Sequence, residues 1–228
     1  MPRIVDHDAR RGELVAAALR VITTEGFAAA SVRRVAHEAG YSAGALRHYF
    51  PRQDALVAAV LDEVTRAAAA RLIPRIRALR AAGPSEVVDT ACALLEELMP
   101  LDEVRATEWA VWSALVDPPS VPGDLERWRS AGWAGTRHHC RSAVRQLAHP
   151  VPGPTGDSAV EVPGAEEVLA STLELSPLPA PEAERRAAGL HAVVDGLSVQ
   201  LVTHPDNVAP DDARAALRQV VGDLAAAL

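Results

Sequence analysis

The sequence predicts an all-α fold, with an N-terminal three-helix helix-turn-helix head and a larger C-terminal helical bundle. Aromatic residues make up only 4% of the 228-residue chain. Alternating β-branched and polar residues are missing, while Ala, Leu, Arg and Glu dominate long segments with a helical period. The hydrophobic content of 49% is sufficient for a real core. We therefore expect helices throughout, with a domain boundary between residues 53 and 54.

Small polar residues, glycines and prolines mark the helix ends in the head. Ser31 and Ser42 each offer an N-cap hydroxyl to a short helix, and Gly26 and Gly40 are placed as C-terminal stops. Pro51 and Asp54 separate the second short helix from a long one. The helices are expected at 8–25, 32–39, 43–50 and from 54 onward.

Proline also divides the larger part of the chain. Pro74 is expected to kink or break the long helix, because proline lacks the backbone N–H that continues the hydrogen-bond ladder. Residues 149–164, rich in Pro and Gly, are expected to form a surface loop. Further helices are expected at about 84–99, 103–116, 123–148, 182–204 and 211–227, with a weak one at 165–174.

Charge is distributed unevenly along the chain. The net formal charge is −7, yet the first 52 residues carry eight Arg against five acids. A basic head on an acidic body is compatible with a nucleic-acid partner for the head. The two cysteines are too few for a disulfide framework, and the sequence contains neither a membrane span nor a signal peptide, so we expect a cytoplasmic protein.

Two short helices joined by a glycine turn form the layout that presents a helix to the major groove of DNA. The first helix is expected to be held in the head's core by Val32, Val35 and Ala39, and the second to be anchored by Leu46 and Phe50. Small residues at 43–45 let the start of the second helix approach base edges. Short helix pairs also occur in bundles that bind no DNA, which is the alternative for the motif. For His37 and His48, the alternative to DNA contact is that they are ordinary surface residues.

Residues 27–57, FAAASVRRVAHEAGYSAGALRHYFPRQDALV, resemble the helix-turn-helix head of the TetR family of bacterial regulators. The stretch GLHAVVDGLSVQLVTHPDNVAPDDARAALRQVV resembles the closing helix pair of the family's choline-regulator-like branch. The resemblance implies a ligand-responsive regulator, most simply a repressor. It would bind a palindromic double-stranded operator as a homodimer and be released by a small-molecule effector of unknown identity.

By position, the resemblance assigns DNA contact to residues on and beside the two short helices. Two departures stand out: Arg47 replaces a frequent Tyr, and Gln53 replaces a Lys that contacts phosphate. Arg52 is the candidate replacement for that contact, and its register is open. The expected DNA-binding set is Ser31, Arg33, Arg34, Ser42, Ala43, Gly44, Ala45, Arg47, His48, Tyr49 and Arg52.

The body carries the other two expected sites. Apolar residues spaced by three and four in the last two helices predict a dimer seam through Leu190, Val193, Val194, Leu197, Leu201, Leu217, Val220, Val221 and Leu224. Aromatic faces beside a carboxylate favour an amphipathic or cationic effector, with core packing as the alternative. The expected effector residues are Met99, Glu108, Trp109, Trp112, Trp128 and His138.

Other function classes have weaker support. His138, His139 and Cys140 are adjacent, but neighbouring helical residues point about 100° apart and do not converge on one ion. No phosphate-binding glycine loop, nucleophile elbow or HExxH motif is present. We expect no catalytic residue, no metal and no cofactor. A helical adaptor that binds only protein is the second alternative.

Overall fold

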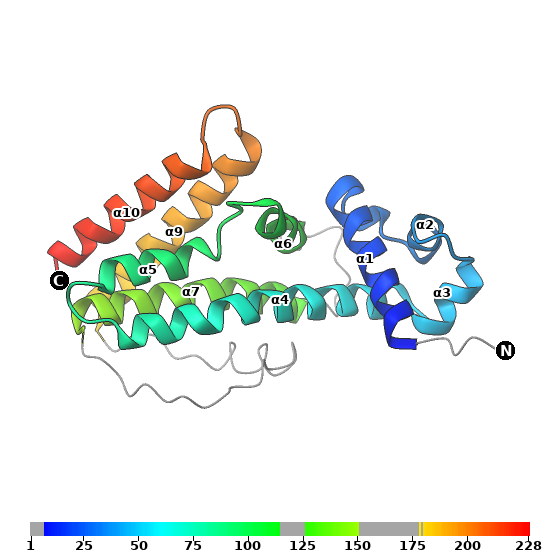
Figure 1. Cartoon of the computed structure of the whole chain (residues 1–228), viewed down its shortest axis with the longest axis horizontal. Helices are drawn as coiled ribbons and strands as arrows, with labels where there is room; N and C mark the ends of the chain where they lie inside the picture. Colours follow the sequence, from blue (N-terminus) through cyan, green and yellow to red (C-terminus); the bar gives the residue numbers. More distant parts are fainter. Residues whose placement is uncertain (1–6, 115–125, 151–177, 179) are drawn as a thin grey trace. The chain divides into compact units, whose positions relative to one another are not determined.

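The computed structural model describes residues 7–114, 126–150, 178 and 180–228. None of these residues lies in a strand, which confirms the all-α class (Figure 1). They form two compact units: Met1–Thr65 with Ala110–Arg129, and Arg66–Trp109 with Ser130–Leu228. We call residues 7–65 the head and the second unit the body. The predicted weak helix at 165–174, and the predicted loop beyond residue 150, lie outside the described residues.

The long helix α1, three short helical segments and the start of a second long helix build the head. Its elements are α1 (His7–Glu25), the 3-10 turn η1 (Phe27–Ala29), α2 (Val32–Glu38), α3 (Ala43–Tyr49) and the first part of α4 (Gln53–Ala81). Of the expected anchors, Val35, Leu46 and Phe50 are buried, whereas Val32 and Ala39 are only half-buried. The three buried anchors share the head's interior with Leu14, Ala18, Val21, Ile22, Ala36, Leu56, Val57, Val60 and Leu61.

Gly40 makes the turn between α2 and α3. Its φ of +74° lies in the left-handed region, where side chains with a Cβ are strained. The N–H of Tyr41 donates to the carbonyl of Ala36 (2.8 Å) and the N–H of Gly40 to that of His37 (3.2 Å). These two bonds form the Schellman arrangement that ends a helix with a glycine. The predicted stop signal is therefore confirmed in its physical detail.

Gly40→Ala should lower the free energy of unfolding by about 1 kcal/mol through backbone strain alone, because no atom lies within 4 Å of the added Cβ. Gly12, exposed inside α1 with equally open space, is the matched control. Gly12→Ala should raise stability by about 0.5–1 kcal/mol, since alanine favours helix. Urea unfolding of both variants measures the two effects. Changes of the same sign would contradict the strain argument.

The body is a bundle of long helices. It contains the remainder of α4, α5 (Val87–Glu96), α9 (Pro181–Thr203) and α10 (Pro210–Ala226), together with most of α6 (Glu103–Ala114) and most of α7 (Glu126–Ala148). α10 packs against both α5 and α9 (Figure 1). Cys92, Leu95, Val144, Leu190 and Leu217 are among the residues that meet in one core. None of the described helices has the length and apolarity needed to cross a membrane.

Of the predicted kink or break at Pro74, the break does not occur. The helix is continuous from Gln53 to Ala81 with Pro74 inside it. Proline removes one hydrogen bond from the ladder, but Leu72, Ile76 and Leu79 on both sides pack on or in the body core. The burial of these flanking turns offsets the local loss.

The residues predicted for the dimer seam differ in their burial within the single chain, and the seam itself stays a prediction. Five of its nine residues, Leu190, Val194, Leu201, Leu217 and Val221, lie in the core of the chain itself. Val193, Leu197, Val220 and Leu224 are partly buried. The stripe in the sequence was real, but it faces the chain's own α5 and α7 residues. The outer side of α9 instead presents Val199 and Val202, which are 47% and 44% exposed.

Candidate functional site

Two serine caps and two buried side chains position the α2–α3 pair. The Oγ of Ser31 accepts a hydrogen bond from the N–H of Arg34 (3.2 Å), and the Oγ of Ser42 accepts one from the N–H of Ala45 (3.1 Å). Each cap satisfies an orphan N–H in the first turn of its helix. Leu46 is buried on the inner side of α3, and its neighbour Arg47 is exposed to solvent.

Arg33 and Arg47 are the exposed cations of this helix pair. Neither makes an ion pair with any residue that the structure describes. Ser42, Gly44 and His48 are also exposed. Ala43 and Ala45 lie between them and are half-buried. The side chains on the surface of α3 are therefore small at its start and basic further along.

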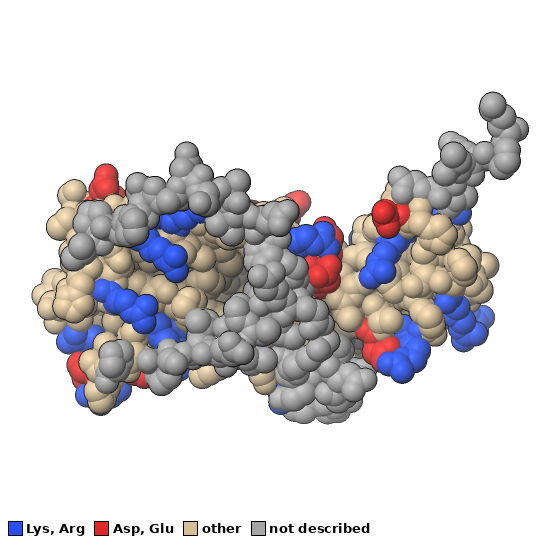
Figure 2. All heavy atoms as spheres, turned by 90° about the horizontal axis from the view of Figure 1, so that it is seen from below, with Lys and Arg blue, Asp and Glu red and all other residues tan. Residues whose placement is uncertain are grey.

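Arg34 and Arg52, in contrast, are engaged by acids of the head. Arg34 donates to Glu25 through Nε (3.0 Å) and Nη2 and to Glu38 through Nη1 (3.1 Å). The hydrogen bonds to Glu25 and then Glu38 raise the pKa of Arg34. Arg52 pairs with Asp54. Basic and acidic side chains consequently lie near one another on the face of the head seen in Figure 2.

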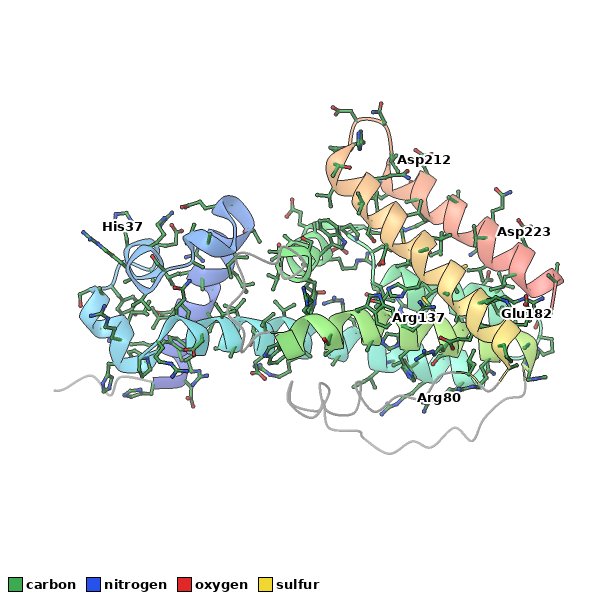
Figure 3. All side chains as sticks on the ribbon, turned by 180° about the vertical axis from the view of Figure 1, so that it is seen from behind. His37, Arg80, Arg137, Glu182, Asp212 and Asp223 are labelled. Carbon is green, nitrogen blue, oxygen red and sulfur yellow. The ribbon has the colours of Figure 1, made fainter. Side chains whose placement is uncertain are left out.

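An aromatic cluster adjoins α3. The ring of Tyr49 lies 4.9 Å from that of His7 and 5.6 Å from that of His48, and His7 also meets His48 at 5.8 Å. His7 comes from the start of α1 and was missed in the sequence, because only the tertiary fold brings it to α3. His37 is exposed on α2, where Figure 3 labels it.

In the body, the carboxylate of Glu108 is occupied. Arg71 donates to Glu108 through Nη1 (2.8 Å) and Nη2, and to Glu97 through Nε (3.2 Å). Glu97 also accepts from Arg75 (3.1 Å). The Glu108 side chain is only 11% exposed, so this is a desolvated network. Glu108 is not the unpaired carboxylate that the predicted cationic ligand needs.

The other predicted effector residues have different surroundings. Met99 is fully buried in the body core, where packing accounts for it. Trp128 is buried, and Trp109 and Trp112 are half-buried. These tryptophans are divided between the two units, so their grouping into one effector site stays a prediction. Burial, followed by nearby arginines, lowers the pKa of His138.

The thiol-enzyme alternative loses support from burial. Cys140 is completely buried, and this raises its thiol pKa to about 12. Burial also lowers the pKa of His139 to about 4. A protonated thiol is a poor nucleophile and a poor metal ligand. Among the described residues there is no cluster of three or more His, Cys, Asp or Glu suited to a metal ion.

Comparison with known proteins agrees with this geometry. Residues 14–60 match the family model "Bacterial regulatory proteins, tetR family", and residues 164–226 match "BetI-type transcriptional repressor, C-terminal". The chain is 40% identical over 116 residues to the HTH-type transcriptional regulator PksA of Bacillus subtilis, covering 50% of this chain and 53% of PksA. It is 25% identical over 218 residues to the regulator BetI 1 of Chromohalobacter salexigens, covering 94% and 89%.

The fold is also similar to that of a solved structure. A transcriptional regulator from Rhodococcus sp. Rha1 aligns with a TM-score of 0.63 and 27% identity, covering 94% of this chain and 95% of that one. The match extends over both the head and the body.

Proposed function

Because the chain belongs to the tetR family of bacterial regulatory proteins, with a BetI-type C-terminal part, we propose that it is a ligand-responsive repressor. It binds a palindromic operator as a homodimer, and a small-molecule effector bound in the body releases the DNA. The relatives are transcriptional regulators rather than enzymes.

The observation that carries this proposal is the state of the arginines on the two short helices. Arg33 and Arg47 project from α2 and α3 without an acid partner among the described residues, whereas Arg34 is held by Glu25 and Glu38. An unpaired guanidinium is available to phosphates or guanine edges without first breaking an ion pair. We therefore assign DNA contact chiefly to Arg33 and Arg47. Arg34 acts mainly by bracing α2.

Operator palindromy follows from symmetry. Two copies related by a two-fold axis present two α3 helices in opposite orientations, and such a pair reads inverted half-sites. The exposed valines on α9 support a second copy as the partner of that surface. The effector then acts by binding the DNA-competent and DNA-incompetent states with different affinities.

Arg33→Ala and Arg47→Ala should each weaken operator binding by about 1–3 kcal/mol while leaving the fold and the assembly state unchanged. The measurement is fluorescence anisotropy with DNA fragments from either side of the protein's own gene. Salt dependence separates the roles, because loss of a phosphate contact reduces the slope of log K against log[salt] by about 1.

Arg185→Ala is the matched control, since Arg185 is a 70%-exposed arginine on α9, far along the chain from the short helices. It should leave DNA affinity within about twofold of wild type. Unchanged affinity in both head variants would remove the case for α2–α3 as the reader. A wild-type protein that binds no DNA fragment but captures a protein would favour the adaptor alternative.

A further inference from the structure

Arg137 stands out among the body's arginines. Its Nε and Nη1 atoms are buried and have no hydrogen-bond partner among the described residues. Figure 3 labels it on α7. Buried polar groups are almost always paired, and a buried cation without an acid is costly. An unpaired buried polar group in a native protein therefore calls for an explanation, and ligand binding is one.

Arg141, one helical turn further along α7, differs from Arg137 in having a carboxylate partner. It donates to both carboxylate oxygens of Glu184 on α9, at 2.7–3.1 Å. Glu184 also accepts from the backbone N–H of Leu178 (3.0 Å), so its acceptor capacity is largely used. One turn further along α9 from Glu184 the residue is Ala188, which offers Arg137 no carboxylate.

Among the described residues no carboxylate forms an ion pair with Arg137, although Arg137 adds to Arg141 in lowering the pKa of Glu184. Asp195 on α9 is 61% exposed, its Oδ2 lies 3.3 Å from Nε2 of His191, and it makes no ion pair with Arg137. Burial lowers the pKa of His191, Arg137 lowers it further, and Asp195 opposes them. His191 therefore adds no cation at neutral pH.

An exposed aromatic side chain adjoins that guanidinium. The Cζ atom of Arg137 lies 5.1 Å from the centre of the Trp133 ring, which is itself 5.5 Å from the ring of His191. Trp133 is 57% exposed, which is unusual for a residue of its size. With so much of its surface in solvent, the indole is accessible to a planar ligand.

We propose that Arg137 and Trp133 form the recognition site for the effector, and that this effector is a small organic monocarboxylate with an aromatic or otherwise planar apolar part. The carboxylate pairs with the guanidinium, as Glu184 does with Arg141, and the apolar part stacks on Trp133. A single cation matches a single negative charge. That the bound monocarboxylate controls DNA release rests on the proposed function. A monocarboxylate replaces the cationic effector that the sequence favours.

The test compares three probes at constant ionic strength: sodium benzoate, neutral benzamide and choline chloride. Isothermal titration calorimetry on the full-length protein, without DNA, should detect benzoate and neither of the others. Arg137→Gln should weaken benzoate binding at least about tenfold, since a charge-assisted pair is lost. Arg137→Lys keeps the charge but loses the planar guanidinium, so its benzoate affinity should lie between those of wild type and Arg137→Gln.

Arg145→Gln is the matched control, because Arg145 is an exposed arginine on the same helix and the charge change is identical. It should bind benzoate like wild type. Arg137→Gln should fold with a melting temperature equal to or above that of wild type, because it removes an unpaired charge. Equal benzoate binding by wild type and Arg137→Gln, or binding of choline and not benzoate, overturns the proposal.

A separate DNA titration keeps this result distinct from the proposed function. If benzoate binding fails while operator binding is intact, the anion site is wrong and the repressor stands. If benzoate binds through Arg137 and no operator fragment is bound, the anion site stands and the repressor is wrong. If benzoate binds through Arg137 but leaves operator affinity unchanged, the site does not bind the effector.

Discussion

Val199→Glu should convert the proposed homodimer to a monomer, with the dimer dissociation constant raised about 100-fold or more. Val199 is 47% exposed on the outer side of α9, and an isologous interface would bury it twice, once from each copy. Placing two unpaired carboxylates in a desolvated seam costs several kcal/mol. Sedimentation velocity over a concentration series measures the change.

The outer side of α9 suits close contact between copies. Gly189, Ala192, Gly196, Val199 and Thr203 are spaced alternately by three and four, so they share one stripe. A Cβ on Gly189 or Gly196 would meet no atom within 4 Å, which shows that these positions face open space. Small residues let helix backbones approach each other.

Val104→Glu is the control, because Val104 is the most exposed large hydrophobic residue of the body and lies on α6 rather than α9. It should remain dimeric. The monomeric Val199→Glu protein should also lose most of its operator affinity, since each copy alone engages one half-site. A dimer of unchanged strength in Val199→Glu would show that the partner uses another face.

Glu108→Gln should lower the free energy of unfolding by about 3 kcal/mol, which is the low end of the range for a broken buried ion pair. The low end applies because Arg71 keeps its bond to Glu97 and its side chain is 29% exposed. Urea denaturation measures the loss. Glu103→Gln, at the exposed start of the same helix, should change stability by less than about 1 kcal/mol.

The double variant Arg71→Met/Glu108→Met should recover most of that loss, to within about 1 kcal/mol of wild type, because apolar side chains of similar volume replace a desolvated pair. Glu97 remains paired with Arg75 and Arg105 in this variant. A Glu108→Gln protein as stable as wild type would contradict the structural role and return Glu108 to the candidates for ligand contact.

Much of the head is determined by local sequence. Ser31, Ser42 and Gly40 act within one helical turn of themselves, through caps and a backbone dihedral angle, so their roles are visible in the sequence. The inward placement of Leu46 follows from helical period in the same way. The all-α class and the expected helix pair rest on these short-range signals.

Tertiary structure alone decided which partner each group has. The stripe through Leu190 and Val194 is equally compatible with a core and with an interface, because periodicity shows that a face is buried and not against what. Likewise, sequence marks Glu108 and Arg137 only as charged. Glu108 is paired because Arg71, distant in the chain, folds beside it. Arg137 makes no ion pair because Glu184, also distant in the chain, bonds to Arg141 instead. A charge's electrostatic role depends on its neighbours in space, and long-range folding supplies them.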